Sequence, residues 1–179
     1  MAKVKISDVS INYELKGKVG SKNKVAFFNG GQSSISSWDI YIPAFEKMGY
    51  EVLLHDFRGQ LLSEKPKGPF TFHQHALDFK ALIDNLGIEK THVISTSYGG
   101  MVAMRFAAEF SDSIQSLSLI DTTSEKDKSL EYHTQNLQNS AKKRDLKNIL
   151  EMITPIIYGN DFLDKHIEYI NQKRNSTAN

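Results

Sequence analysis

Residues 91–104 contain the pattern that most limits how this chain can fold: a strand-like run, a tight turn around a serine, and a helix-like segment of small residues. The turn, residues 95–99, reads Ser-Thr-Ser-Tyr-Gly. Small residues two positions to either side of Ser97 are what a strained turn between a strand and a closely packed helix requires. The pattern therefore predicts Ser97 on a sharp strand-to-helix turn, with its hydroxyl exposed and the next backbone N–H able to bind an oxyanion. An ordinary polar residue in a βα turn is the alternative interpretation.

Strand and helix patterns alternate along the first two thirds of the chain. The runs at 25–28 and 51–55 are typical of strands buried on both faces, and further strands are predicted at 92–94 and 115–120. Apolar residues at helical spacing lie at 72–86, and helices are also predicted at 38–48 and 98–110. Alternating apolar and polar residues at 3–6 and 11–15 predict an opening hairpin. This order predicts an α/β fold with a parallel-type sheet, which binds ligands at the carboxyl ends of its strands.

The composition changes at Asp121. Residues 122–147 are rich in charged and amide side chains, and apolar stripes at 146–153 and 162–170 predict further helices. We therefore expect two parts: a sheet-forming core over residues 1–124, and a helical addition over residues 125–179.

Composition and charge exclude several functional classes. The chain has 22 Lys and Arg against 21 Asp and Glu, so no long-range field favours nucleic acid or an acidic membrane. It has no cysteine, which excludes disulfides and thiolate metal sites. His73 and His75 are two residues apart on a predicted helix and cannot bind one metal together. Neither G-x-G-x-x-G nor G-x-x-x-x-G-K-[ST] occurs, so a nucleotide-binding domain is disfavoured. Together with the absence of a long apolar run, these features predict a cytoplasmic protein without metal or cofactor.

A second glycine-rich turn follows the apolar run 25–28. It reads Asn29-Gly30-Gly31, which taken alone indicates only a tight turn. If this strand lies beside the strand that precedes Ser97, the glycine pair would let backbone N–H groups approach a developing oxyanion.

The order and spacing of these motifs resemble the α/β-hydrolase family, in its enol-lactonase, haloperoxidase-like and carbon–carbon bond hydrolase branch. The matching segments are the strand and glycine turn 27–31, the Ser-Trp pair 37–38, the D-x-R-G-x-G-x-S-x-x-P loop 56–66, the serine turn 95–99, the strand exit 117–123 and a cap-like segment 158–174. The chain departs from the family pattern at Ser95 and Leu61, where glycine is usual, and at Asn29, where histidine is commoner.

The resemblance implies an α/β-hydrolase sheet that is incomplete, with a partial helical cap in residues 125–179. It implies that Ser97 is the nucleophile and that the backbone N–H groups of Gly31 and Tyr98 form the oxyanion hole. It also implies no cofactor, and a local ion pair for Arg58 rather than contact with substrate.

The catalytic partners of such a serine follow it in the order acid, then histidine. Neither the acid strand nor the histidine loop is visible in this sequence, so we expect a C-terminally truncated member. Residues 152–161 imitate the acid strand, but their spacing favours the cap. His133 and His166 lie in polar helical stretches, typical of solvated positions. Asp121, at the end of the strand 115–120, is the candidate acid, or else it caps the next segment.

Two functional hypotheses follow. The first is a serine hydrolase acting on a small ester, lactone or related carbonyl substrate through Ser97, with little activity from the chain alone because a serine without a base is a poor nucleophile. The second is a non-catalytic binding protein on a hydrolase scaffold. In either case we expect a small-molecule ligand, no nucleic acid or membrane partner, and homo-oligomers formed through the sheet edge at 115–120 or the C-terminal helices.

Overall fold

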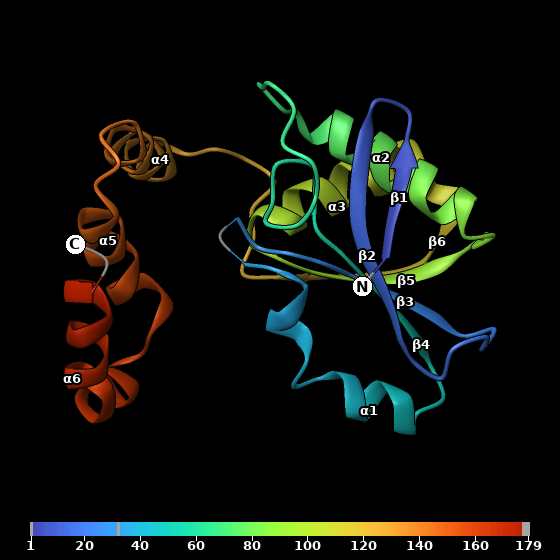
Figure 1. The fold of residues 1–179 in the computed structure, drawn as a ribbon, viewed down its shortest axis with the longest axis horizontal. Helices are drawn as coiled ribbons and strands as arrows, with labels where there is room; N and C mark the ends of the chain where they lie inside the picture. Colours follow the sequence, from blue (N-terminus) through green and yellow to red (C-terminus); the bar gives the residue numbers. More distant parts are fainter. Residues whose placement is uncertain (1, 32, 177–179) are drawn as a thin grey trace. The chain divides into compact units, whose positions relative to one another are not determined.

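The computed structural model describes residues 2–31 and 33–176. The chain divides into two compact units, Met1–Ser124 and Glu125–Asn179. The first unit contains all six strands of the described chain: β1 (Ala2–Ile6), β2 (Val9–Gly17), β3 (Lys24–Phe28), β4 (Glu51–His55), β5 (Thr91–Thr96) and β6 (Ile114–Ile120). Its helices are η1 (Ile35–Trp38), α1 (Ile42–Lys47), α2 (Phe72–Asn85), α3 (Tyr98–Glu109) and η2 (Ser111–Ser113). Figure 1 shows these elements in chain order.

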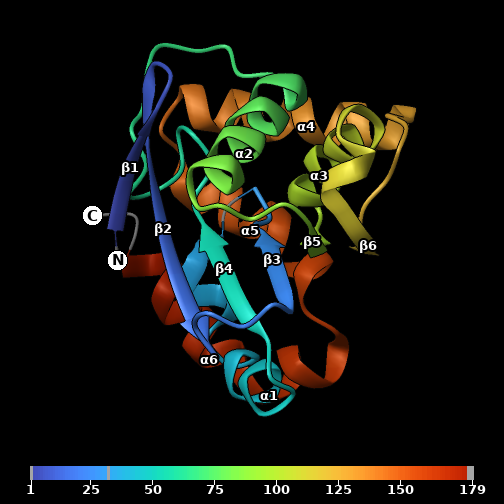
Figure 2. The same ribbon diagram turned by 90° about the vertical axis from the view of Figure 1, so that its right-hand side faces the viewer.

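The strands form one mixed sheet in the order β1-β2-β4-β3-β5-β6. The hairpin β1–β2 joins β4 in antiparallel pairing, while β4, β3, β5 and β6 are mutually parallel, so the predicted parallel-type sheet is confirmed. In the register, Phe28 is paired with Ser95, and Ser95 with Leu119. The carboxyl ends of β3, β5 and β6 therefore lie side by side, as can be followed in Figure 2.

Side chains of β3 alternate between two apolar clusters, one on each face of the sheet. Phe27 packs against η1 and α1, with its ring centroid 4.7 Å from that of Trp38. Phe28 points the other way, towards α2 and α3, where its ring lies 4.5 Å from Phe79 and 6.4 Å from Phe106. Figure 1 shows α1 on one side of the sheet and α2 with α3 on the other. Burying each of these phenyl rings stabilises the fold by about 1.5–3 kcal/mol, which fixes the strand that leads into the glycine turn.

The prediction of a single helix over residues 38–48 is wrong. The structure has the short 3₁₀ helix η1, a turn over residues 39–41, and then α1. Pro43 lies in the first turn of α1, where its missing N–H costs nothing. Within a continuous helix the same proline would lose a backbone hydrogen bond and clash with the preceding turn, so the helix has to start again at this point.

The second unit is helical, as predicted, and consists of α4 (Lys128–Lys142), α5 (Leu146–Ile157) and α6 (Asn160–Ser176). Carboxylates cap the N-termini of α4 and α5. Asp127 accepts a hydrogen bond from the Leu130 N–H at 2.7 Å, and Asp145 accepts one from the Asn148 N–H at 3.0 Å. Residues 152–161 lie in α5 and the start of α6, so they form no acid strand. No helix in the described part of the chain has the length and apolarity to cross a membrane.

Candidate active site

Ser97 occupies the junction between β5 and α3 in a strained conformation. Its φ and ψ angles are 49° and −119°, outside the regions that a non-glycine residue normally adopts. Hydrogen bonds hold its backbone on both sides. Its N–H donates to the Ile120 carbonyl at 3.0 Å, and its own carbonyl accepts from Thr122 Oγ1 at 2.7 Å and from the N–H groups of Gly100 at 2.9 Å and Met101 at 3.4 Å. The side chain is exposed and makes no cap hydrogen bond to α3. The strain, about 1–3 kcal/mol, is therefore maintained by neighbouring backbone while the hydroxyl stays accessible.

The small residues around Ser97 are required by close contacts. A β-carbon added to Gly99 would lie 2.5 Å from the Phe28 carbonyl oxygen, and one added to Gly100 would lie 2.5 Å from Thr122 Oγ1. Ser95 is fully buried, and its hydroxyl donates to the Ser118 carbonyl on β6 at 3.0 Å. Serine is therefore accommodated where the family pattern has glycine, because its polar atom has a partner.

The glycine turn after β3 lies against the serine turn. A β-carbon added to Gly30 would lie 3.8 Å from Ser97 Cβ, and one added to Gly31 would lie 3.7 Å from Tyr98 Cβ. The backbone N–H groups of Gly31 and Tyr98 donate no hydrogen bond to any residue that the structure describes. Two uncommitted N–H donors thus belong to the two turns that meet at an exposed serine hydroxyl, a set of groups suited to binding an oxyanion.

A buried polar network supports the glycine turn. Asn29, fully buried, donates through Nδ2 to the His55 carbonyl at 2.8 Å and accepts from Trp38 Nε1 at 2.8 Å. Asp56 accepts from Asn12 Nδ2 at 3.0 Å and from Asn29 Nδ2 at 3.3 Å. Asn29 takes the place of the commoner histidine, and its side chain hydrogen-bonds to four residues, His55, Asp56, Trp38 and Gln60. The turn is therefore held by residues that lie far apart in the sequence.

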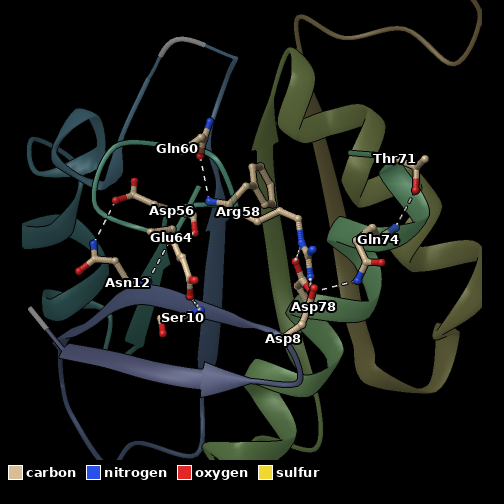
Figure 3. A network of polar contacts seen from close by, with 12 residues as sticks. Asp8, Ser10, Asn12, Asp56, Arg58, Gln60, Glu64, Thr71, Gln74 and Asp78 are labelled. Atoms are coloured by element: carbon tan, nitrogen blue, oxygen red, sulfur yellow. Dashed lines mark hydrogen bonds and ion pairs between the residues drawn. The ribbon is translucent and has the colours of Figure 1, made fainter. Parts of the chain in front are cut away.

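Arg58 pairs locally, as the resemblance implied. Its Nε and one terminal nitrogen bind Asp78 on α2 at 2.5 and 2.7 Å, and the same terminal nitrogen binds Asp8 at 3.0 Å (Figure 3). The hydrogen bond to Asp78 raises the pKa of Arg58, and that to Arg58 lowers the pKa of Asp8. The guanidinium charge is therefore compensated and held away from an anionic ligand.

A pocket of about 220 Å³ opens beside the two N–H donors. It is lined by Gly31, Phe57, Arg58, Gly59, Gln60, Phe70, His75 and Tyr98. Three aromatic rings dominate this lining, and burial raises the pKa of the Tyr98 phenol, which keeps it protonated as a donor. Since its arginine is already paired, the pocket suits an uncharged, mostly apolar group.

Two buried histidines contact Phe57, a residue of the pocket lining, and His75 itself lines the pocket. Both ring nitrogens of His55 and the Nδ1 of His75 lack a hydrogen-bond partner in the described structure. Burial lowers the pKa of His55 to about 3 and that of His75 to about 4, so both are neutral near pH 7. Sequence reasoning placed His55 in a packed position but missed His75 in the pocket. The signal was present, because His75 precedes Phe79 by four residues on the buried face of α2.

The candidate partners of Ser97 are less closely assembled. Asp121 directly follows β6, with φ of 48° and an exposed side chain, and its carboxylate has no hydrogen bond to a described residue. None of the four histidines in the first unit hydrogen-bonds to Ser97 within the described residues. His133 lies on α4 and His166 on α6, where the His166 ring is 4.4 Å from Phe162. Residues 2–31 and 33–176 contain no group of three or more potential metal ligands.

Comparison with known proteins places this geometry in a family. The sequence model of the alpha/beta hydrolase fold family matches residues 25–173. The chain is 33% identical over 102 residues to a soluble epoxide hydrolase of Corynebacterium sp. (strain C12). The matched stretch covers 57% of this chain and 35% of that protein. It is 29% identical over 123 residues to 2-hydroxy-6-oxo-6-phenylhexa-2,4-dienoate hydrolase of Comamonas testosteroni, covering 64% of this chain and 41% of that protein.

The fold comparison agrees with the sequence comparison. The crystal structure of an enol-lactonase from Burkholderia xenovorans LB400 superposes with a TM-score of 0.84 at 23% identity, covering 97% of this chain and 66% of the lactonase. The chain thus spans between about a third and two thirds of the length of these proteins. The family match extends over most of the sequence and over both units, and this chain therefore belongs to the alpha/beta hydrolase fold family.

Proposed function

We propose that this chain carries the nucleophile and oxyanion hole of a serine hydrolase that acts on a small ester, lactone or related carbonyl compound. The observation that carries the proposal is the strained, exposed Ser97 on a turn that lies against the Gly30–Gly31 turn, with the N–H groups of Gly31 and Tyr98 uncommitted to other described residues. A family that includes hydrolases of several bond types supports hydrolysis in general. Serine as the exposed residue favours attack on a carbonyl carbon, because the alkoxide produced there is what paired N–H donors bind.

In the proposed reaction Ser97 Oγ forms a bond to the carbonyl carbon, and the carbonyl π electrons move to oxygen. The N–H groups of Gly31 and Tyr98 donate to that oxyanion. When the carbonyl re-forms, the alkoxy group leaves with a proton, and an acyl-serine remains until water releases the acid. The apolar pocket beside Tyr98 would hold the acyl or alcohol group, and residues 125–179 would act as a partial helical cap.

The proton of the Ser97 hydroxyl needs an acceptor. Asp121 is the proposed acid, because it follows the strand next to β5 at the same edge of the sheet. An acid alone orients a base but is a weak one, so we expect the isolated chain to turn over slowly, with residual rate from binding and the oxyanion hole. We further propose a cytoplasmic location, on the ground that the chain has no cysteine.

A non-catalytic binding protein is the second candidate. The observation that favours it is the lack, within the described first unit, of a histidine bonded to Ser97. In that case the pocket lined by Phe57, Phe70 and Tyr98 would bind a small carbonyl compound without converting it.

Labelling with an alkyl fluorophosphonate separates the two candidates. The enzyme hypothesis predicts a mass increase of one phosphonyl group on Ser97, lost in Ser97→Ala. Ser118→Ala is the matched control, since it makes the same chemical change on β6. Asp121→Asn should slow labelling if Asp121 acts on the serine. Saturable binding of a small ester without labelling would favour the binding protein instead.

A further inference from the structure

Gln60 connects the loop after β4 to the glycine turn after β3. Its side-chain Oε1 accepts from the Phe57 N–H at 3.0 Å, and its Nε2 donates to the Gly30 carbonyl at 3.0 Å. Asn29 Nδ2 lies a further 3.3 Å from the same Oε1. Figure 3 shows the contact of Gln60 with the loop backbone. The amide is half-buried at the pocket wall, with both of its ends engaged by backbone.

The hydrogen bond to Gly30 determines where the Gly31 N–H points. The peptide bond between the two glycines is planar and trans, so its C=O and N–H point in opposite directions. The Gly30 carbonyl is held by two donors, Gln60 Nε2 and the Ser33 N–H at 3.2 Å. With its carbonyl fixed, the same peptide presents the Gly31 N–H on the other side.

This constraint matters because glycine itself supplies none. Gly30 and Gly31 have no β-carbon to limit rotation of the peptide between them, and a flip would exchange the positions of the C=O and the N–H. A carbonyl turned towards Ser97 would repel an oxyanion. Of the two donors on the Gly30 carbonyl, the Ser33 N–H belongs to the turn itself and can move with it, whereas Gln60 is anchored to the next loop through Phe57.

We infer that Gln60 is a positioning residue for the oxyanion hole, which it maintains by holding the Gly30–Gly31 peptide with its N–H directed towards the oxyanion. The inference rests on the proposed function of Ser97. It requires no contact between Gln60 and the reacting atoms. A glutamine is suited to the position because its amide accepts from one backbone group and donates to another.

The test compares wild type with Gln60→Met, which keeps the length but removes both hydrogen bonds, and with Gln60→Glu, which keeps the acceptor and removes the donor. Gln74→Met on α2 is the control, because Gln74 is also half-buried and its side-chain amide donates to Asp78 at 3.3 Å, on another element than the glycine turn. Two readouts are measured: the second-order rate of fluorophosphonate labelling of Ser97, and the ¹H–¹⁵N residual dipolar coupling of Gly31, which reports the direction of that N–H.

We expect both Gln60 variants to change the Gly31 coupling while those of β3 stay as in wild type, and to label about 10-fold to 100-fold more slowly. Gln74→Met should match wild type in both. An unchanged Gly31 coupling in Gln60→Met would overturn the inference, and so would a changed coupling with an undiminished labelling rate. If wild type is not labelled but the coupling changes as expected, the serine hydrolase proposal fails while the control of this N–H by Gln60 stands.

Discussion

At the scale of single residues, the contact between α3 and β3 depends on the absence of one carbon atom. A β-carbon at Gly99 would lie 2.5 Å from the Phe28 carbonyl oxygen and 2.6 Å from that of Asn29. Both are backbone atoms of a buried strand end, which cannot move aside without disturbing the sheet. We expect Gly99→Ala to lower the free energy of unfolding by about 1–3 kcal/mol, measured by urea denaturation. Gly159→Ala, which meets nothing within 4 Å, should stay within about 0.5 kcal/mol of wild type.

The buried histidines predict how stability varies with pH. His55 and His75 have pKa values near 3 and 4 in the folded chain, against 6.5 for the free side chain. At pH values between the folded and the unfolded pKa, the unfolded chain binds more protons than the folded one. The free energy of unfolding therefore has its full value above pH 6.5 and falls as the pH drops towards 4. Each histidine contributes a slope of roughly 1.4 kcal/mol per pH unit in that range. His75 also faces Asp78, which favours its charged form, and Arg58, which opposes it.

Unfolding in urea at a series of pH values from 7.5 to 4.5 measures this slope. His55→Leu should reduce the slope of unfolding free energy against pH by the contribution of one histidine, because it removes one of the two titrating groups. His166→Gln, an exposed position, should leave the slope as in wild type. A wild-type slope equal to that of His55→Leu would contradict the assignment.

At the scale of elements, one ion pair joins the loop after β4 to α2. Arg58 and Asp78 are both buried, and a second carboxylate, that of exposed Asp8, shares the guanidinium. Asp78→Asn would leave most of the buried charge without compensation. We expect a loss of about 2–3 kcal/mol in unfolding free energy.

The same helix offers a matched control. Asp84 pairs with Lys80 four residues earlier on the exposed face of α2, at 2.5 Å. Pairs of this kind contribute less than about 1 kcal/mol, so Asp84→Asn should be close to neutral. Equal effects of the two substitutions in thermal or urea unfolding would show that burial does not strengthen the Arg58 pair.

Helices and strands could be predicted from the sequence where neighbouring residues alone determine them. The strand predicted at 51–55 has the ends observed for β4, because its apolar residues 52–54 give a local signal for a strand buried on both faces. The helix predicted at 38–48 failed at Pro43, where a local backbone constraint overrides the apolar spacing.

The backbone geometry of the candidate site was predictable where its signal is local in sequence. Ser97 and its flanking small residues are adjacent along the chain, so the turn geometry follows from the pattern alone. Gln60 and His75 were missed because their positions depend on how separate loops meet across the sheet. Gln60 contacts a carbonyl 30 residues earlier, a pairing that follows only from the order of β4, β3 and β5.

At the scale of the whole molecule, the sheet has an unusual edge. Strand β6 is the last in the order and pairs only with β5 among the described strands. Most of its residues are exposed, including Leu119 at 43% and Ile120 at 50% of their surface. A bare strand edge offers unpaired N–H and C=O groups, and apolar side chains beside it favour burial against another surface.

The helical unit adds apolar surface of its own, since Ile156, Ile157 and Ile167 are exposed on α5 and α6. The chain therefore presents two surfaces that association would bury, the β6 edge and these helices, and its net charge of +1 gives little electrostatic repulsion between copies.

We propose that the chain forms homo-oligomers through these surfaces, and light scattering over a concentration series should show a mass above 20.2 kDa. Leu119→Lys places a charge at the β6 edge and should shift the distribution towards monomer, because charged edge residues disfavour strand addition. Leu61→Lys makes the same change at another exposed leucine, far along the chain from β6, and should leave the mass unchanged. Association that persists in Leu119→Lys would assign the contact to the helices instead, whereas a monomeric wild type at high concentration would rule out both surfaces.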